Sequence, residues 1–324
     1  MAAASQLRLF SPDNTYPLPS DMSLRQGFEL VARPTFLNAS KATLWEYSSA
    51  INRWEEFTDN PPVTQIDDAA CDSFTQAVMD SEVVANTTYN KWARHLRGIF
   101  NRLGPRDSRN KLGKGVMPLI PIIQFLNEEL NDPRVIPLEH LSQLYEACEV
   151  ATWPRRPGAT PALRWRCLLV LLYNCGPRRD DALLLTKESL QANGMLRFTA
   201  KKTRKKQCVP LHPVVHAHFA LLPRDNFSLL GMPTTNRRDF YATWHAIIKA
   251  AGVPNYIPKD LRKTCGTELD LQFEGAASWV LGHSENVTRK YYINPNEKVT
   301  KAVLAMRQPE AFLKILQEPL APAL

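Results

Sequence analysis

The chain has 324 residues, of which 44% are apolar and 22% are charged. This is the composition of a globular protein, it excludes a disordered chain, and the length suffices for two domains with separate cores. The net charge of +8 favours a polyanionic partner such as nucleic acid. The longest apolar run, residues 167–173, is too short to cross a bilayer, so we expect no membrane partner.

The six cysteines are spread along the chain without a C-x-x-C pair. This spacing predicts reduced thiols in a cytoplasmic protein and argues against a disulfide framework or a zinc site. The N-terminal sequence lacks a basic segment followed by an apolar core, so no signal peptide is expected. Residues 1–28 carry Pro, Ser, Asn and Asp with little periodicity, and we expect them to form a flexible arm.

Three helices are predicted in the N-terminal half. The first begins after a cap at residues 38–40 and ends before the Pro-containing residues 59–62. A shorter helix follows over residues 67–80. The third, over residues 87–103, has the strongest pattern, because Trp92 begins an apolar stripe at helical spacing.

The opposite side of the third helix is basic and includes Lys91, Arg94 and Arg97. The simpler interpretation is a bundle helix with a solvated basic face. In a chain with this net charge, contact with DNA phosphates is an equally good interpretation. We therefore treat these three residues as candidate DNA-binding residues.

The C-terminal half begins at the Pro-containing break at residues 131–137. Its pattern predicts two short strands over residues 195–200 and 207–211, joined by a basic hairpin turn. Further helices are predicted from residue 138, over 163–174, 212–222, 236–251, 257–271, 276–281, 286–292 and 297–306, and beyond 308.

The expected fold is therefore mainly α-helical with a small β-hairpin, in two domains. After the arm of residues 1–28, a helical domain covers residues 29–130 and a second domain covers residues 131–310. Residues 311–324 form a C-terminal tail with an apolar face, which packs against this molecule or another.

Four separated segments carry the chemistry. They are G-P-R-R-D-D-A-L-L-L at 176–185, A-K-K-T-R-K-K-Q-C-V-P-L at 200–211, P-K-D-L-R-K-T at 258–264 and L-G-H-S-E-N-V-T-R-K-Y-Y at 281–292. Arginine and lysine bind an anionic phosphorus centre, and a tyrosine hydroxyl serves as a covalent nucleophile. The segments thus contain the residue types needed to attack a phosphodiester with a phenol.

In this order, the four segments resemble the catalytic domain of the tyrosine recombinases, the phage-integrase family. In that family the order is Arg, Asp or Glu, a hairpin Lys, H-x-x-R, L-G-H and a Tyr nine residues later. The resemblance implies a helical core-binding domain, which clamps DNA, followed by a DNA breaking-rejoining catalytic domain. In the N-terminal half, the resemblance rests on the helical pattern and not on sequence motifs.

By position, the resemblance makes Arg178 the first catalytic arginine and Asp181 the acid that orients it. Arg179 is the less favoured alternative, because the Gly-x-Arg spacing selects its neighbour. The L-R-K-T sequence makes Arg262 the second arginine. The resemblance implies that both guanidinium groups hold the non-bridging oxygens of the scissile phosphate.

Lys202 corresponds to the hairpin lysine, with Lys201 as its nearest competitor. The resemblance implies that it protonates the departing 5′ oxygen. His283 belongs to L-G-H, and the nine-residue spacing selects Tyr292 as the nucleophile, with Tyr291 as the rival.

One position departs from the family, which usually has His where Lys259 stands. A lysine there still binds a phosphate oxygen, but an ammonium group is a poor proton acceptor. The other cations of the hairpin are interpreted as DNA-binding residues: Lys201, Arg204, Lys205 and Lys206.

The implied function is a site-specific recombinase or integrase of a mobile element. It cuts and rejoins strands of double-stranded DNA through a 3′-phosphotyrosyl link, without metal, ATP or other cofactor. The resemblance also implies a homotetramer on paired sites and a nucleoid-associated location in the cytoplasm. The alternatives are a DNA relaxing enzyme of the type IB topoisomerase kind and a DNA-binding protein that has lost its chemistry.

Overall fold

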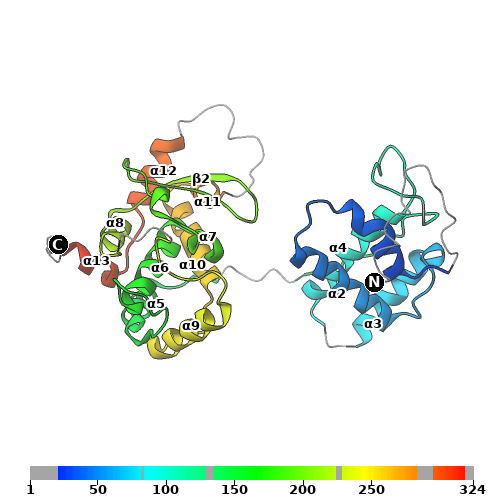
Figure 1. Cartoon of the computed structure of the whole chain (residues 1–324), viewed down its shortest axis with the longest axis horizontal. Coiled ribbons are helices and arrows are strands. Elements are labelled where there is room, and N and C mark those ends of the chain that lie inside the picture. The colour runs from blue at the N-terminus through cyan, green and yellow to red at the C-terminus, as the bar shows by residue number, and fades with distance from the viewer. Residues whose placement is uncertain (1–20, 82–83, 129–133, 224–227, 283–294, 318–324) are drawn as a thin grey trace, which may run out of the picture. The chain divides into compact units, whose positions relative to one another are not determined.

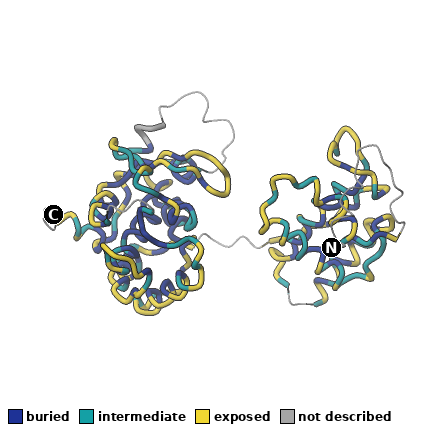
Figure 2. Tube along the Cα trace, in the orientation of Figure 1, coloured by how far each residue is buried: buried dark blue, intermediate teal, exposed yellow. Residues whose placement is uncertain are grey.

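The computed structural model describes residues 21–81, 84–128, 134–223, 228–282 and 295–317. These residues are mostly helical and contain one two-stranded sheet, which confirms the predicted mainly α-helical fold (Figure 1). The chain divides into two compact units, Met1–Asn131 and Asp132–Leu324. Each unit has its own buried core (Figure 2). Within the described residues, no helix is both long and apolar enough to cross a membrane.

The core of the first unit is built around Trp54. Its ring lies 5.3 Å from that of Phe74 and 5.9 Å from that of Phe100. The predicted caps are present, since the side chain of Ser40 accepts a hydrogen bond from the N–H of Thr43 at 3.1 Å. The α-helices among the described residues of this unit are α1 (Leu24–Gly27), α2 (Lys41–Phe57), α3 (Asp68–Asp80) and α4 (Asn86–Leu103).

Residues 21–28 differ from the flexible arm expected at the N-terminus. Met22, Leu24 and Phe28 are buried in the first core, and a capping box of Ser23 and Gln26 starts α1. The expectation was wrong for these residues because tertiary packing, and not local periodicity, orders so short a helix. The remainder of the arm lies outside the described residues.

An extended strap, residues 120–128, covers α3 and α4. The amide of Asn90, which is only 2% exposed, donates to the carbonyl of Leu126 at 2.7 Å and accepts from its N–H at 2.8 Å. The N–H of Ile122 donates to Asp68 at 2.7 Å. Side chains of the two helices therefore satisfy backbone groups of the strap, which has no regular secondary structure of its own.

The centre of the second unit is α6 (Pro161–Cys175), which is buried on nearly all sides (Figure 2). Thr160 caps its start, Pro161 occupies its first turn, and Gly176 ends it in the left-handed conformation with φ of +55°. The other helices of the unit are α5 (Leu138–Ala147), α7 (Arg179–Ala182), α8 (Pro213–Ala220), α9 (Arg237–Ala251), α10 (Pro258–Gln272), α11 (Ala276–Leu281), α12 (Pro295–Leu304) and α13 (Glu310–Gln317).

The predicted hairpin is present as β1 (Met195–Thr199) and β2 (Lys206–Pro210), which pair antiparallel. Leu196 faces Val209 across the hairpin, and both are buried. The turn, residues 201–205, is exposed (Figure 2). The basic residues of the hairpin are therefore presented to solvent, and its apolar face packs on the unit.

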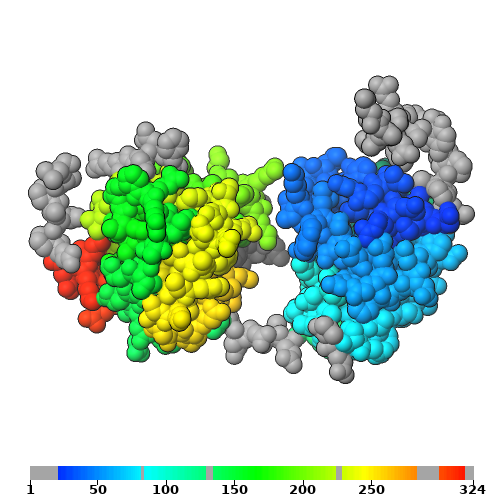
Figure 3. Space-filling model, turned by 60° about the horizontal axis from the view of Figure 1, so that its bottom comes forward, coloured from blue at the N-terminus to red at the C-terminus, as the bar shows by residue number. Residues whose placement is uncertain are grey.

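The C-terminal helix α13 belongs to the core of the second unit, where a separate tail had been expected from residue 311. Phe312 is fully buried, and its ring lies 5.2 Å from that of Tyr145. The helix packs against α5 and α8, and Figure 3 shows it in red beside the green segment. Of the two packing alternatives for the apolar face, the structure shows the intramolecular one. The helix predicted over 286–292 lies outside the described residues.

Candidate active site

Arg262 joins two helix ends of the second unit. Its Nη2 donates to the carbonyl of Leu281 at 2.7 Å, at the end of α11, and its Nη1 donates to the carbonyl of Gly176, at the end of α6. The side chain comes from the second turn of α10 and is buried. The last carbonyls of a helix lack intrahelical partners and carry partial negative charge, so a guanidinium group satisfies both ends at once.

Burial and the nearby charge of Arg178 lower the pKa of Arg262 to about 10. Desolvation disfavours the charged form, and a second cation close by disfavours it further. The guanidinium group remains protonated at neutral pH. The hydrogen bond from Arg262 to Gly176 also holds it against the chain two residues before Arg178. Two arginines far apart in the sequence therefore belong to one region, an arrangement that an anion between them would stabilise.

Asp181 connects Arg178 to the hairpin. Its Oδ2 lies 3.9 Å from Nη1 of Arg178, and its Oδ1 accepts a hydrogen bond from the backbone N–H of Lys201 at 2.8 Å. The carboxylate is almost fully buried, whereas the side chain of Arg178 is 32% exposed. One buried acid therefore fixes both the arginine and the start of the hairpin turn.

Arg179 has a different environment from its neighbour. Its guanidinium carbon lies 5.3 Å and 5.2 Å from the ring centres of Phe240 and Tyr241 on α9, and it pairs with Asp180. A cation stacked on aromatic rings and paired with an acid is already satisfied. This geometry favours Arg178 over Arg179 as the phosphate-binding residue.

The two lysines of the predicted site are exposed. Lys202 lies in the hairpin turn directly after Lys201. The backbone N–H of Lys201 donates a hydrogen bond to Asp181. Lys259 is in the first turn of α10, three residues before Arg262. Residues at this spacing lie on the same side of a helix.

The predicted histidine and both tyrosines, His283, Tyr291 and Tyr292, lie outside the described residues. The described chain reaches Gly282, which directly precedes the histidine and has φ of +65°. Of the predicted catalytic residues, the structure therefore brings together Arg178, Asp181 and Arg262, with the backbone of the hairpin.

In the first unit, Lys91, Arg94 and Arg97 all lie on α4 as predicted. Lys91 pairs with Glu46 of α2, and Arg94 lies 3.2 Å from Glu128 of the strap. These are exposed pairs, which contribute little stability, so both cations remain available to a competing phosphate. Arg97 is exposed.

Gln207 was not predicted to belong to this region. Its Nε2 donates to the carbonyl of Leu281 at 3.3 Å, the same oxygen that Arg262 binds. The residue is 8% exposed, although it is polar and lies on a two-stranded hairpin. Strand alternation places it on the inward face with Val209, and that pattern was the available signal.

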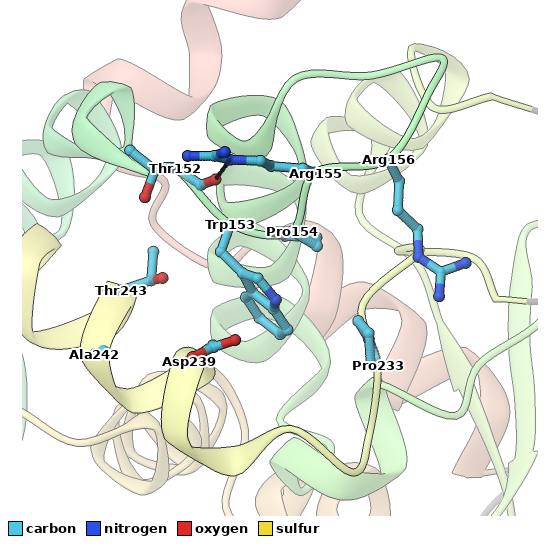
Figure 4. Close-up of a pocket in the computed structure, with 9 residues that line it drawn as sticks. All are labelled: Thr152, Trp153, Pro154, Arg155, Arg156, Pro233, Asp239, Ala242 and Thr243. Carbon is cyan, nitrogen blue, oxygen red and sulfur yellow. Dashed lines mark hydrogen bonds between the residues drawn. The ribbon is translucent and has the colours of Figure 1, made fainter.

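A cavity of about 480 Å³ opens between residues 152–156 and the first turns of α9 (Figure 4). Trp153 and Asp239 line it, together with two arginines of the loop. None of the predicted catalytic residues lines it, so it is separate from the arginine pair. Among the described residues, no cluster of His, Cys, Asp and Glu could hold a metal ion.

No protein-family model matches the chain, and no curated protein matches it in sequence. Solved structures do match it. The chain is similar to a lambda integrase tetramer bound to a Holliday junction, with a TM-score of 0.58 and 16% identity over 88% of this chain and 82% of that one. It is also similar to the Tn1549 transposon integrase in complex with circular intermediate DNA, with a TM-score of 0.61 and 13% identity over 92% of this chain and 100% of that one.

A third match is the XerH site-specific recombinase bound to its difH substrate, with a TM-score of 0.53 and 16% identity over 87% of this chain and 81% of that one. The chain therefore has the fold of the tyrosine recombinases and integrases, which confirms at the level of the fold the resemblance seen in the four motifs. At these identities the likeness concerns the fold, and the chemistry is a separate question.

Proposed function

We propose that the protein is a site-specific DNA recombinase or integrase that cuts and rejoins DNA strands through a 3′-phosphotyrosyl intermediate. The observation that carries the proposal is the hydrogen bond from Arg262 to the carbonyl of Gly176, two residues before Arg178, with Asp181 linking Arg178 to the basic hairpin. The fold is shared with solved recombinases in complexes with DNA. The net charge of +8 suits a DNA partner.

In this proposal the hydroxyl oxygen of Tyr292 attacks the scissile phosphorus. A new bond forms between that oxygen and phosphorus, and the bond from phosphorus to the 5′ oxygen breaks. Arg178 and Arg262 hold the non-bridging oxygens as charge develops on them, and Lys202 gives its proton to the departing 5′ oxygen. Lys259 binds a phosphate oxygen. The proton that the tyrosine hydroxyl loses passes to the neutral imidazole of His283, or to solvent if His283 instead binds the phosphate.

The phosphotyrosyl link retains the energy of the phosphodiester, so rejoining needs no ATP. The charge on the phosphate is met by side chains, so the proposed reaction uses no metal ion. In the proposal, the duplex is contacted by Lys91, Arg94 and Arg97 of the first unit and by the hairpin cations Lys201, Arg204, Lys205 and Lys206. The solved lambda integrase assembly is a tetramer on a Holliday junction, and we propose the same number of copies on paired sites here.

The test begins with DNA sites selected from a random duplex library for binding to the full-length protein. Each selected site is then nicked at successive positions, so that cleavage near the nick releases a short strand and traps a covalent adduct. We expect a protein–DNA adduct that survives denaturing electrophoresis and forms in the presence of EDTA. Tyr292→Phe should abolish the adduct, and Tyr291→Phe, the matched control, should keep it.

The two alternative functions, a type IB topoisomerase and a DNA-binding protein without chemistry, give different results in the same assay. A type IB topoisomerase also forms the adduct, but it relaxes supercoiled plasmid without a selected site and does not join two duplexes. A DNA-binding protein without chemistry shifts the selected duplex and never forms an adduct, and that outcome would refute the proposed function. If Tyr291→Phe loses the adduct and Tyr292→Phe keeps it, the nucleophile is Tyr291.

A further inference from the structure

We propose that Gln207 is a positioning residue, which sets the geometry of the turn that precedes His283 and couples that turn to the hairpin of Lys202. This inference rests on the proposed function and assigns a role to a residue outside the four motifs. It follows from three observations: the hydrogen bonds at the carbonyl of Leu281, the close approach of Gln207 to Gly282, and the hydrogen bond between Lys201 and Asp181.

The first contact fixes the turn. Nε2 of Gln207 donates to the carbonyl of Leu281 at 3.3 Å, and Nη2 of Arg262 donates to the same oxygen at 2.7 Å. A carbonyl oxygen has two lone pairs, so both donors are accommodated. The final carbonyl of α11 is therefore held from one side by the hairpin and from the other by a predicted catalytic arginine.

The second observation is the close approach of Gln207 to Gly282. A Cβ atom added at Gly282 would overlap Nε2 of Gln207 and lie 3.1 Å from its Cδ. Gly282 has φ of +65°, a conformation that glycine adopts at little cost. The side-chain amide thus packs directly on the backbone of the last described residue before His283.

The third contact fixes the other side of the hairpin turn. The N–H of Lys201 donates to Asp181, whose other oxygen faces Arg178. The hairpin is consequently attached at two points, through Lys201 and Asp181 to Arg178 and through Gln207 to Leu281 and Gly282 at the end of α11. The attachment through Gln207 is buried, where a hydrogen bond is exchanged less readily with water, and the attachment through Lys201 is partly buried.

Gln207 occupies a buried strand position, where an apolar residue would be sufficient if the position served only to stabilise the fold. Its strand neighbours alternate, with Lys206 and Cys208 exposed and Val209 buried. A buried amide without a partner is unfavourable, and this one is satisfied by the catalytic turn. Its chemistry therefore serves the position of the turn rather than the stability of the sheet.

The test measures three quantities on the full-length protein: the single-turnover rate of adduct formation on the nicked site, the Kd for the same duplex, and the Tm. Gln207→Met keeps the length of the side chain and removes the donor. We expect adduct formation to slow about tenfold, the effect of one lost buried hydrogen bond. The Kd should change less than twofold. Cys208→Ser, on the outward face of the same strand, is the control and should match wild type.

A double-mutant cycle separates positioning from general stability. Gly282→Ala places its Cβ against the amide, so it should slow adduct formation strongly in wild type and less when Gln207→Ser has removed the obstacle. The backbone strain of the alanine is the same in both backgrounds and cancels. We expect a coupling of at least about fivefold, as for residues in contact.

The proposal is overturned if Gln207→Met forms the adduct within twofold of the wild-type rate, or if the two substitutions are additive. It is also overturned if a lower Tm and weaker DNA binding account for the slower rate. Wild-type protein is the reference in every measurement. Absence of an adduct from wild type would refute the proposed function and this role with it, whereas normal wild-type cleavage with an unchanged Gln207→Met rate would refute only the role of Gln207.

Discussion

Gly176 is the position where a single methyl group should disturb both the fold and the predicted site. It ends α6 with φ of +55°, and a Cβ added there would overlap Cδ2 of Leu281 and lie 3.1 Å from Sγ of Cys265. Its carbonyl also accepts the hydrogen bond from Arg262. We therefore expect Gly176→Ala to displace Leu281 and to shift the buried guanidinium group.

Gly252 provides a matched control. It ends α9 in the same left-handed conformation, with φ of +65°, and nothing lies within 4 Å of an added Cβ. Left-handed backbone costs an L-residue about 1–2 kcal/mol, and both alanine variants share this cost. Only Gly176→Ala adds overpacking, which typically costs about 1–3 kcal/mol.

The difference between the two variants is the quantity to measure, by urea denaturation and calorimetry of the full-length protein. At about 3 °C per kcal/mol for a domain of this size, Gly176→Ala should unfold roughly 3–9 °C below Gly252→Ala. Adduct formation should also fall in Gly176→Ala and not in Gly252→Ala. Equal Tm values for the two variants would refute the packing of the α6 end against Leu281.

Three further predictions concern other parts of the molecule. Asn90→Ala removes the amide that binds both backbone groups of Leu126, so it should destabilise the first unit by about 1–3 kcal/mol, for two partly buried hydrogen bonds left unmade. Limited proteolysis should then cut the strap first, and an unchanged cleavage pattern would contradict this. Burial lowers the pKa of His218, so its neutral form is favoured in the fold, and the stability it contributes is present above its ordinary pKa and lost as the pH falls below that value. The Tm of wild type should therefore drop between pH 7.5 and 5.5 by more than that of His218→Gln, and parallel curves would show that another group is responsible. Arg178→Ala should slow adduct formation about 10²–10³-fold, the effect of losing one preorganised donor, whereas Arg179→Ala should stay within about threefold; the reverse order would exchange their roles.

Much of the secondary structure could be predicted because its signals are local. Ser40 caps α2, and Gly176 and Gly252 end α6 and α9, since each acts through its own side chain or backbone conformation. The hairpin was predicted within one residue at each end, because alternation and a basic turn are short-range patterns. The order of the motifs also predicts the residue types of the proposed site: two arginines, a hairpin lysine, a histidine and a tyrosine pair.

The tertiary structure decided what depends on contacts between distant segments. It buries Met22 and Phe312, which local patterns assigned to an arm and a tail, because the apolar partners of each belong to other helices. It distinguishes the environments of Arg178 and Arg179, because it places the ring of Phe240 beside Arg179. A sequence shows which side chains are able to bind a phosphate, but their convergence is a long-range property, since it depends on helix ends that only the packed core brings together.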